Sequence, residues 1–96
     1  MTEDHRQAAR TRLSELVALL QLGADARAAA IVSECEALSR AIGAFHMEGI
    51  RFRIYNVDRL LRALPAEPPG AAALLEDARK HLEAAGFHTR SHQAPT

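Results

Sequence analysis

The sequence predicts an all-α domain: three or four helices in a hairpin or bundle, with a long central helical segment. Two observations lead to this prediction. Apolar residues recur at three- and four-residue steps through most of the chain, which is the spacing of one helix face. The stretch from Ala24 to Leu64 contains no proline, so it can be read as one helix of roughly 60 Å.

A rod of that length does not fit inside a compact globule of this size, whose radius of gyration is about 13 Å. The central segment therefore either breaks near Gly43 or Gly49, or pairs with a second copy of the chain. We expect homodimerisation to complete the bundle. A neutral balance of 12 basic and 12 acidic residues removes the net charge that would keep copies apart.

The first helix is predicted from a stripe formed by Ala9, Leu13, Leu16 and Leu20. Gly23 follows this helix at the position where glycine often ends one. The next apolar stripe begins within a few residues, and so short a turn predicts an antiparallel helical hairpin.

The central segment carries two apolar stripes that are rotated by roughly 100° relative to each other. The first runs from Ile31 to Phe45 and the second from Met47 to Leu64. Glycine costs about 1 kcal/mol inside a helix, so Gly43 and Gly49 make a bend or a break between the stripes plausible. The residues that we assign to the core or to the dimer interface are Ile42, Phe45, Ile50, Ile54, Val57 and Leu61.

Residues 49–54 also alternate between apolar and polar side chains, which is typical of a β-strand, and residues 86–90 could supply a partner strand. The helical stripe continues through Val57, Leu61 and Leu64 without a turn signal, so we favour the helix.

Pro65 to Pro69 predicts a connector before the last helix, because a residue that precedes proline is disfavoured in the α region. Gly86 and Phe87 have the pattern of a Schellman motif, in which a left-handed glycine and a hydrophobic contact end a helix. We therefore expect one helical domain over residues 1–87 and a polar, mobile tail over residues 88–96.

Composition narrows the function classes. Balanced charge disfavours a general nucleic-acid binder, which needs many uncompensated cations. No apolar run approaches the ~20 residues of a membrane span, and the polar N-terminal residues do not resemble a secretory signal, so we expect a cytoplasmic protein. Cys35 is the only cysteine, and His88 and His92 follow the predicted helix end, so we expect neither a cofactor nor a metal.

The strongest polar cluster lies in the second half of the central segment. Arg51, Arg59 and Arg62 share a helix face, with Tyr55 alongside, whereas Arg53 points elsewhere. These arginines are candidates for binding a ligand or a partner. The first interpretation is a solvated face whose ion pairs contribute little to stability. The arginines could instead pair with Glu34, Glu36 and Glu48 of an antiparallel partner, or hold an anionic ligand. His46, between the two glycines, is a further candidate as a surface or interface residue.

The sequence contains no recognisable catalytic constellation, so it gives no reason to expect an enzyme, although it does not decide the question. We expect a small protein-interaction or regulatory module that acts through dimerisation and the docking of another protein. The alternative is a binder of an anionic ligand or nucleic acid through the arginine face.

Overall fold

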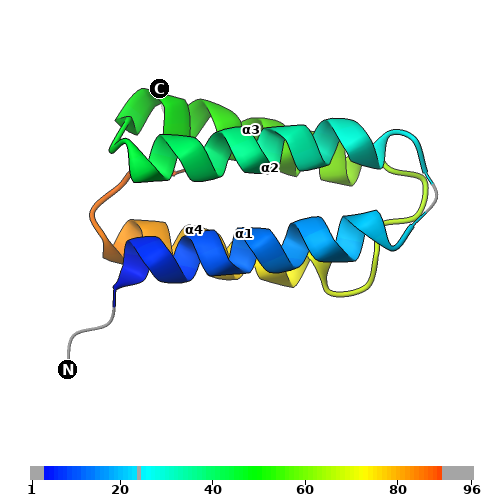
Figure 1. Cartoon of the computed structure of the whole chain (residues 1–96), viewed down its shortest axis with the longest axis horizontal. Helices are drawn as coiled ribbons and strands as arrows, with labels where there is room; N and C mark the ends of the chain where they lie inside the picture. Colours follow the sequence, from blue (N-terminus) through cyan, green and yellow to red (C-terminus); the bar gives the residue numbers. More distant parts are fainter. Residues whose placement is uncertain (1–3, 24, 90–96) are drawn as a thin grey trace, which may run out of the picture.

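The computed structural model describes residues 4–23 and 25–89, which form four α-helices and contain no β-strand. The helices are α1 (His5–Gln21), α2 (Ala28–Gly43), α3 (Met47–Arg62) and α4 (Ala71–Ala84). In Figure 1, α2 and α3 form one layer and α1 and α4 the other. The radius of gyration is 12.9 Å, as expected for a compact chain of this length. The all-α prediction is confirmed, and so is the choice of helix over strand for residues 49–54.

The central segment is not one continuous helix: it breaks after Gly43, one of the two alternatives that the sequence left open, and α3 folds back along α2. The break is a Schellman motif without glycine. Phe45 has a φ of 57° and its N–H bonds to the carbonyl of Ile42 at 3.2 Å, while the N–H of His46 bonds to the carbonyl of Ala41 at 3.0 Å. Phe45 thus takes the left-handed position that glycine usually occupies.

The two glycines that suggested the break have other roles. Gly43 is the last residue of α2. Gly49 lies in the first turn of α3, where its N–H donates to Nδ1 of His46 at 3.1 Å, so His46 caps the helix. A Cβ at position 49 would lie 2.3 Å from that nitrogen. Glycine is therefore needed here to make room for the cap.

The C-terminal end of α4 follows the prediction. Gly86 has a φ of 101°, its N–H bonds to the carbonyl of Glu83, and the N–H of Phe87 bonds to the carbonyl of Leu82 at 2.9 Å. Phe87 packs into the core, as the hydrophobic contact of a Schellman motif should. Packing extends further than expected, because Thr89 is buried and its hydroxyl donates to Glu83 at 2.7 Å. The rest of the predicted tail, residues 90–96, lies outside the described residues.

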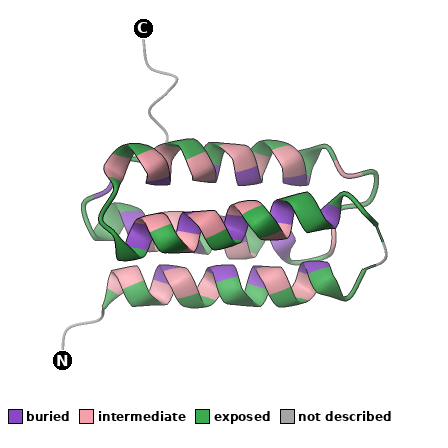
Figure 2. Cartoon of the chain, turned by 45° about the horizontal axis from the view of Figure 1, so that its top comes forward, coloured by how far each residue is buried: buried purple, intermediate pink, exposed green. Residues whose placement is uncertain are grey.

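The core is formed by one face of each helix, and the buried faces point inward in Figure 2. Five of the six residues that we assigned to the core or dimer interface are fully buried within the single chain, namely Ile42, Ile50, Ile54, Val57 and Leu61. Phe45 is the exception: it is 63% exposed, because the helix break turns it out of the bundle.

Both apolar stripes of the central segment are covered within one chain. The break lets α3 lie antiparallel to α2, and α1 and α4 supply the opposite layer. The apolar surface that led us to expect a dimer is thus buried without one. A dimer would have to form through a different surface. None of the described helices is both long enough and apolar enough to cross a membrane.

Candidate functional site

The outward face of α3 is the part of the described surface with the most distinctive chemistry. Its exposed residues follow one another at alternating steps of four and three, opposite the buried stripe. Two aromatic residues lie in the middle, an acid at the N-terminal end and two arginines at the C-terminal end. We call this set the outer stripe; it consists of Glu48, Phe52, Tyr55, Arg59 and Arg62.

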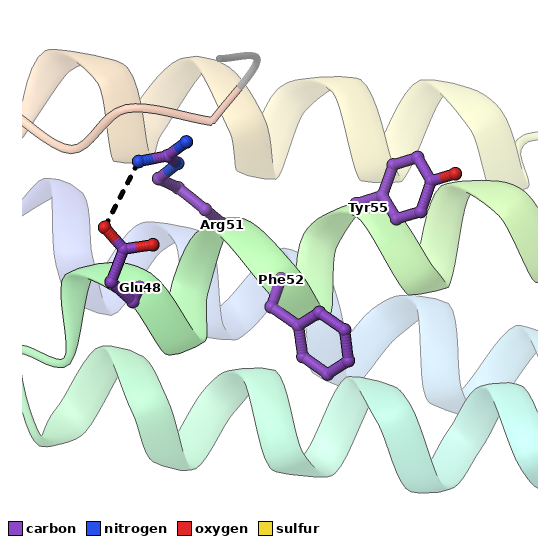
Figure 3. Close-up of a pocket in the computed structure, with 4 residues that line it drawn as sticks. All are labelled: Glu48, Arg51, Phe52 and Tyr55. Atoms are coloured by element: carbon purple, nitrogen blue, oxygen red, sulfur yellow. Dashed lines mark hydrogen bonds and ion pairs between the residues drawn. The ribbon is translucent and has the colours of Figure 1, made fainter. Parts of the chain in front are cut away.

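The two aromatic side chains of the outer stripe are unusually accessible. Phe52 is 55% exposed and Tyr55 is 44% exposed. With Glu48 and Arg51 they line a hollow of about 220 Å³. Figure 3 shows Phe52 leaning toward α2, whereas Arg51 and Tyr55 lie on the side of α4. Aromatic side chains with a polar rim are enriched at protein interfaces, so the composition of this hollow suits a docking surface.

Phe52 also borders a second hollow, in the groove between α2 and α3. This groove has a volume of about 420 Å³, and its walls include Arg40, His46 and Arg53. Phe52 therefore forms a ridge between two depressions. A ridge with a depression on either side gives a surface shape into which another side chain can interlock.

Most arginines near this face already have carboxylate partners. Arg53 binds both oxygens of Glu34 on α2 at 3.1 Å, and Arg62 binds Asp58 at 3.0 Å. Arg51 binds Glu48 at 3.2 Å. Arg59 is exposed and makes no ion pair with residues 4–23 or 25–89. The expected charge matching between an acidic and a basic half is thus partly met within the chain, by α3 lying back along α2.

These pairings argue against the anion-binding alternative. Arg51 and Arg62 are each neutralised by a neighbour on their own helix, and Arg53 is directed toward α2, away from the other arginines. An anion site needs several uncompensated donors that converge on one point. Arg59 alone among these four arginines meets the first requirement.

The remaining predicted residues fall into different roles. His46 is exposed but its Nδ1 is engaged as a helix cap, which is a structural role that the sequence analysis did not foresee. Tyr55 lies in the hollow beside Arg51, as expected for neighbours on one face. Phe52 was not predicted as a site residue, and Glu48 was named only as a possible partner for the arginines of a second copy. Their spacing from Tyr55 and Arg59 was a signal that could have identified them.

Histidine and cysteine side chains are further groups of chemical interest among the described residues. No group of three or more His, Cys, Asp or Glu side chains there is placed to hold a metal ion. Nδ1 of His5 and Nδ1 of His81 lie 2.9 Å apart. Burial raises the pKa of the Cys35 thiol to about 12, with smaller contributions from Glu34 and Glu36, so it is not a reactive thiolate.

Comparisons with known proteins do not add to this geometry. A scan against protein-family models gives no match, and searches of curated proteins and of solved structures find no significant similarity. The outer stripe and its two adjoining hollows are therefore the features that point to a function.

Proposed function

We propose that this chain is a protein-interaction module that acts through homodimerisation, with the outer stripe of α3 as its docking surface. In this proposal the dimer then presents its remaining surface to another protein. The observation that supports it is the pair of adjacent exposed aromatic side chains, Phe52 and Tyr55, beside a hollow with charged edges.

The other exposed large hydrophobic residues offer weaker alternatives. Leu22 is the C-cap of α1 and stands alone at 85% exposure. Phe45 is covered on one face by the guanidinium of Arg6, whose carbon lies 3.7 Å from the ring centre. Phe52 and Tyr55 are the exposed pair that lies within a regular helix, where the backbone holds both side chains in a fixed relation. Rigid aromatic anchors of this kind dominate the binding energy of many interfaces.

A measurement of mass against concentration tests the proposal. An interface made by one helix face belongs to the smaller and weaker class, so sedimentation should be followed up to about 100 µM. We expect wild-type chain to approach twice its mass of 10.5 kDa. The double variant Phe52→Ala/Tyr55→Ala should stay monomeric.

Leu22→Ala is the matched control, because it also removes an exposed hydrophobic side chain but lies away from α3. It should associate like wild type. A wild-type chain that remains monomeric over the whole range would refute the proposal, as would a double variant that associates as tightly as wild type.

A further inference from the structure

We infer that two copies pair through their outer stripes in antiparallel orientation, with Phe52 against Tyr55 of the partner subunit and Glu48 against Arg59 of the partner subunit. This inference rests on the proposed homodimerisation. It adds the orientation, the register and the residues that each copy contributes to the other's hollow.

Four residues of the outer stripe are placed symmetrically along α3. Glu48 lies four residues before Phe52, and Arg59 lies four residues after Tyr55. These four residues are therefore spaced equally about a point midway between the two aromatic residues, and Arg62 lies beyond this symmetric set. A two-fold axis through that point places Phe52 of each copy opposite Tyr55 of the partner subunit. The same axis places Glu48 of each copy opposite Arg59 of the partner subunit. A homodimer interface of this type must be self-complementary, and this arrangement satisfies that condition.

The charges of Glu48 and Arg59 also favour the antiparallel pairing. Arg59 lacks an ion-pair partner among the described residues. Arg51 occupies only Oε2 of Glu48, so Oε1 has no donor from residues that the structure describes. The antiparallel pairing brings this oxygen to the guanidinium of Arg59 twice, once on each side of the axis. A parallel pairing would instead place Glu48 against Glu48 and Arg59 against Arg59, and like charges in contact are destabilising.

The spacing and shape of the outer stripe also suit packing against a second copy. Steps of four and three residues average close to 3.5, the spacing at which two helices cross at a shallow angle and stay in contact along their length. Phe52 stands as a ridge beside the 220 Å³ hollow that Tyr55 helps to line. In the antiparallel register, the ridge of one copy faces the hollow of the other. The partner copy thus fills the depression that the isolated chain leaves open.

Charge reversal gives a direct test. Glu48→Arg places two arginines together, and Arg59→Glu places two glutamates together, at both ends of the stripe. Each single variant should weaken dimerisation about tenfold or more at low salt. The double variant Glu48→Arg/Arg59→Glu restores opposite charges and should dimerise within about threefold of wild type.

Mixing the two single variants gives an independent readout. An equimolar mixture of Glu48→Arg and Arg59→Glu chains brings arginines against glutamates at both ends. It should therefore form a heterodimer under conditions in which neither variant dimerises alone. Matched controls are Glu36→Arg on α2 and Lys80→Glu on α4, which reverse exposed charges away from the stripe and should leave dimerisation unchanged.

The results of these experiments distinguish a failure of the proposed homodimerisation from a failure of the antiparallel register. If wild-type chain never dimerises, the proposed function itself fails. If wild type dimerises through Phe52 and Tyr55, but the two charge reversals have no effect or the mixture does not recover, the antiparallel register is wrong while the proposed function stands. Recovery in both the double variant and the mixture supports the register.

Discussion

On the inner face of α3, Ile50, Ile54, Val57 and Leu61 are at most 2% exposed, whereas on the outer face Phe52 and Tyr55 are about half exposed. Both faces repeat at the same helical spacing, yet one holds only aliphatic side chains and the other mixes aromatic with charged ones. If the chain dimerises as proposed, stability and association are carried by opposite sides of one helix. Mutations should therefore separate the two properties.

The largest expected difference is between the stabilities of the variants Ile54→Ala and Phe52→Ala. Ile54 is fully buried, so its truncation should lower the free energy of unfolding by about 2–5 kcal/mol. Phe52 is exposed, so its truncation should cost less than about 1 kcal/mol while weakening dimerisation. Urea unfolding, below the concentration at which dimers form, measures the first effect. Equal losses for both variants would contradict the division between the faces.

The core that the inner face of α3 joins also contains Cys35 of α2, which is 1% exposed. Its folded pKa of about 12 exceeds the ordinary value of 9.0, so the folded chain favours the neutral thiol. Stability from this source is fully present below pH 9 and is lost as the pH rises toward 12. At pH 11, two units above the ordinary value, the loss should be about 3 kcal/mol.

Comparing wild type with Cys35→Ala isolates this contribution from that of other alkaline groups. The variant has a small cavity but no thiol to ionise. The difference in stability between the two chains should therefore shrink as the pH rises from 8 to 11. A constant difference would mean that the thiol is equally able to ionise in both states.

At the N-terminal end of α3, the effect of Gly49→Ala on stability should change sign when His46 is removed. Gly49→Ala places a methyl group against Nδ1 of His46, so it should cost about 1 kcal/mol through loss of the cap. In a His46→Ala background the obstruction is gone. There the same substitution should stabilise by about 1 kcal/mol, because alanine is the better helix former. Chemical denaturation of the four chains measures both, and a loss in both backgrounds would rule out His46 as the cause.

The turn before α3 should show a backbone effect of similar size, but of one sign only. Phe45→Gly should be more stable than Phe45→Ala by about 1 kcal/mol, because alanine keeps the cost of the left-handed backbone. Both variants lose the contact with Arg6 equally, so their difference reports the backbone alone. Thermal unfolding compares them. Equal stability would show that the turn relaxes once the ring is removed.

The smallest change in stability is expected on the outer face. Replacing Arg51, Arg59 and Arg62 with glutamine should alter the free energy of unfolding by less than about 1 kcal/mol, because exposed ion pairs contribute little. Dimerisation should weaken, since Arg59 is lost from the interface. An unchanged dimer, combined with loss of a stabilising effect of phosphate seen in wild type, would instead favour the anion-binding alternative.

Sequence reasoning predicted the helical fold well, because a buried face leaves a regular apolar pattern. Ile54 and Leu61 could be assigned to the core from spacing alone. The end of α4 at Gly86 was also predictable, since glycine is the usual signal for a left-handed residue. The matching end of α2 was not, because Phe45 carries no such signal and its conformation is supported by contacts with Arg6 and Phe87 from distant parts of the chain.

The helix break also decides what could be predicted of the candidate site. From the sequence, the two apolar stripes offered more aliphatic surface than the flanking helices could cover, and this suggested a dimer. Pairing within the chain, such as Arg53 with Glu34, depends on the helix break and is invisible in the sequence. Tyr55 and Arg59 lie on the outer stripe as exposed residues, but Phe52 was considered only as part of a strand pattern.

The pairing of α1 with α4 has a consequence for how the bundle comes apart. These two helices lie at opposite ends of the chain and make the most extensive contact in the molecule, with His5 reaching His81. Closing a contact between distant segments costs more chain entropy than closing one between neighbours. Either terminal helix that separates also uncovers the apolar face of the other. Unfolding should therefore proceed as one cooperative event, without gradual fraying from the ends.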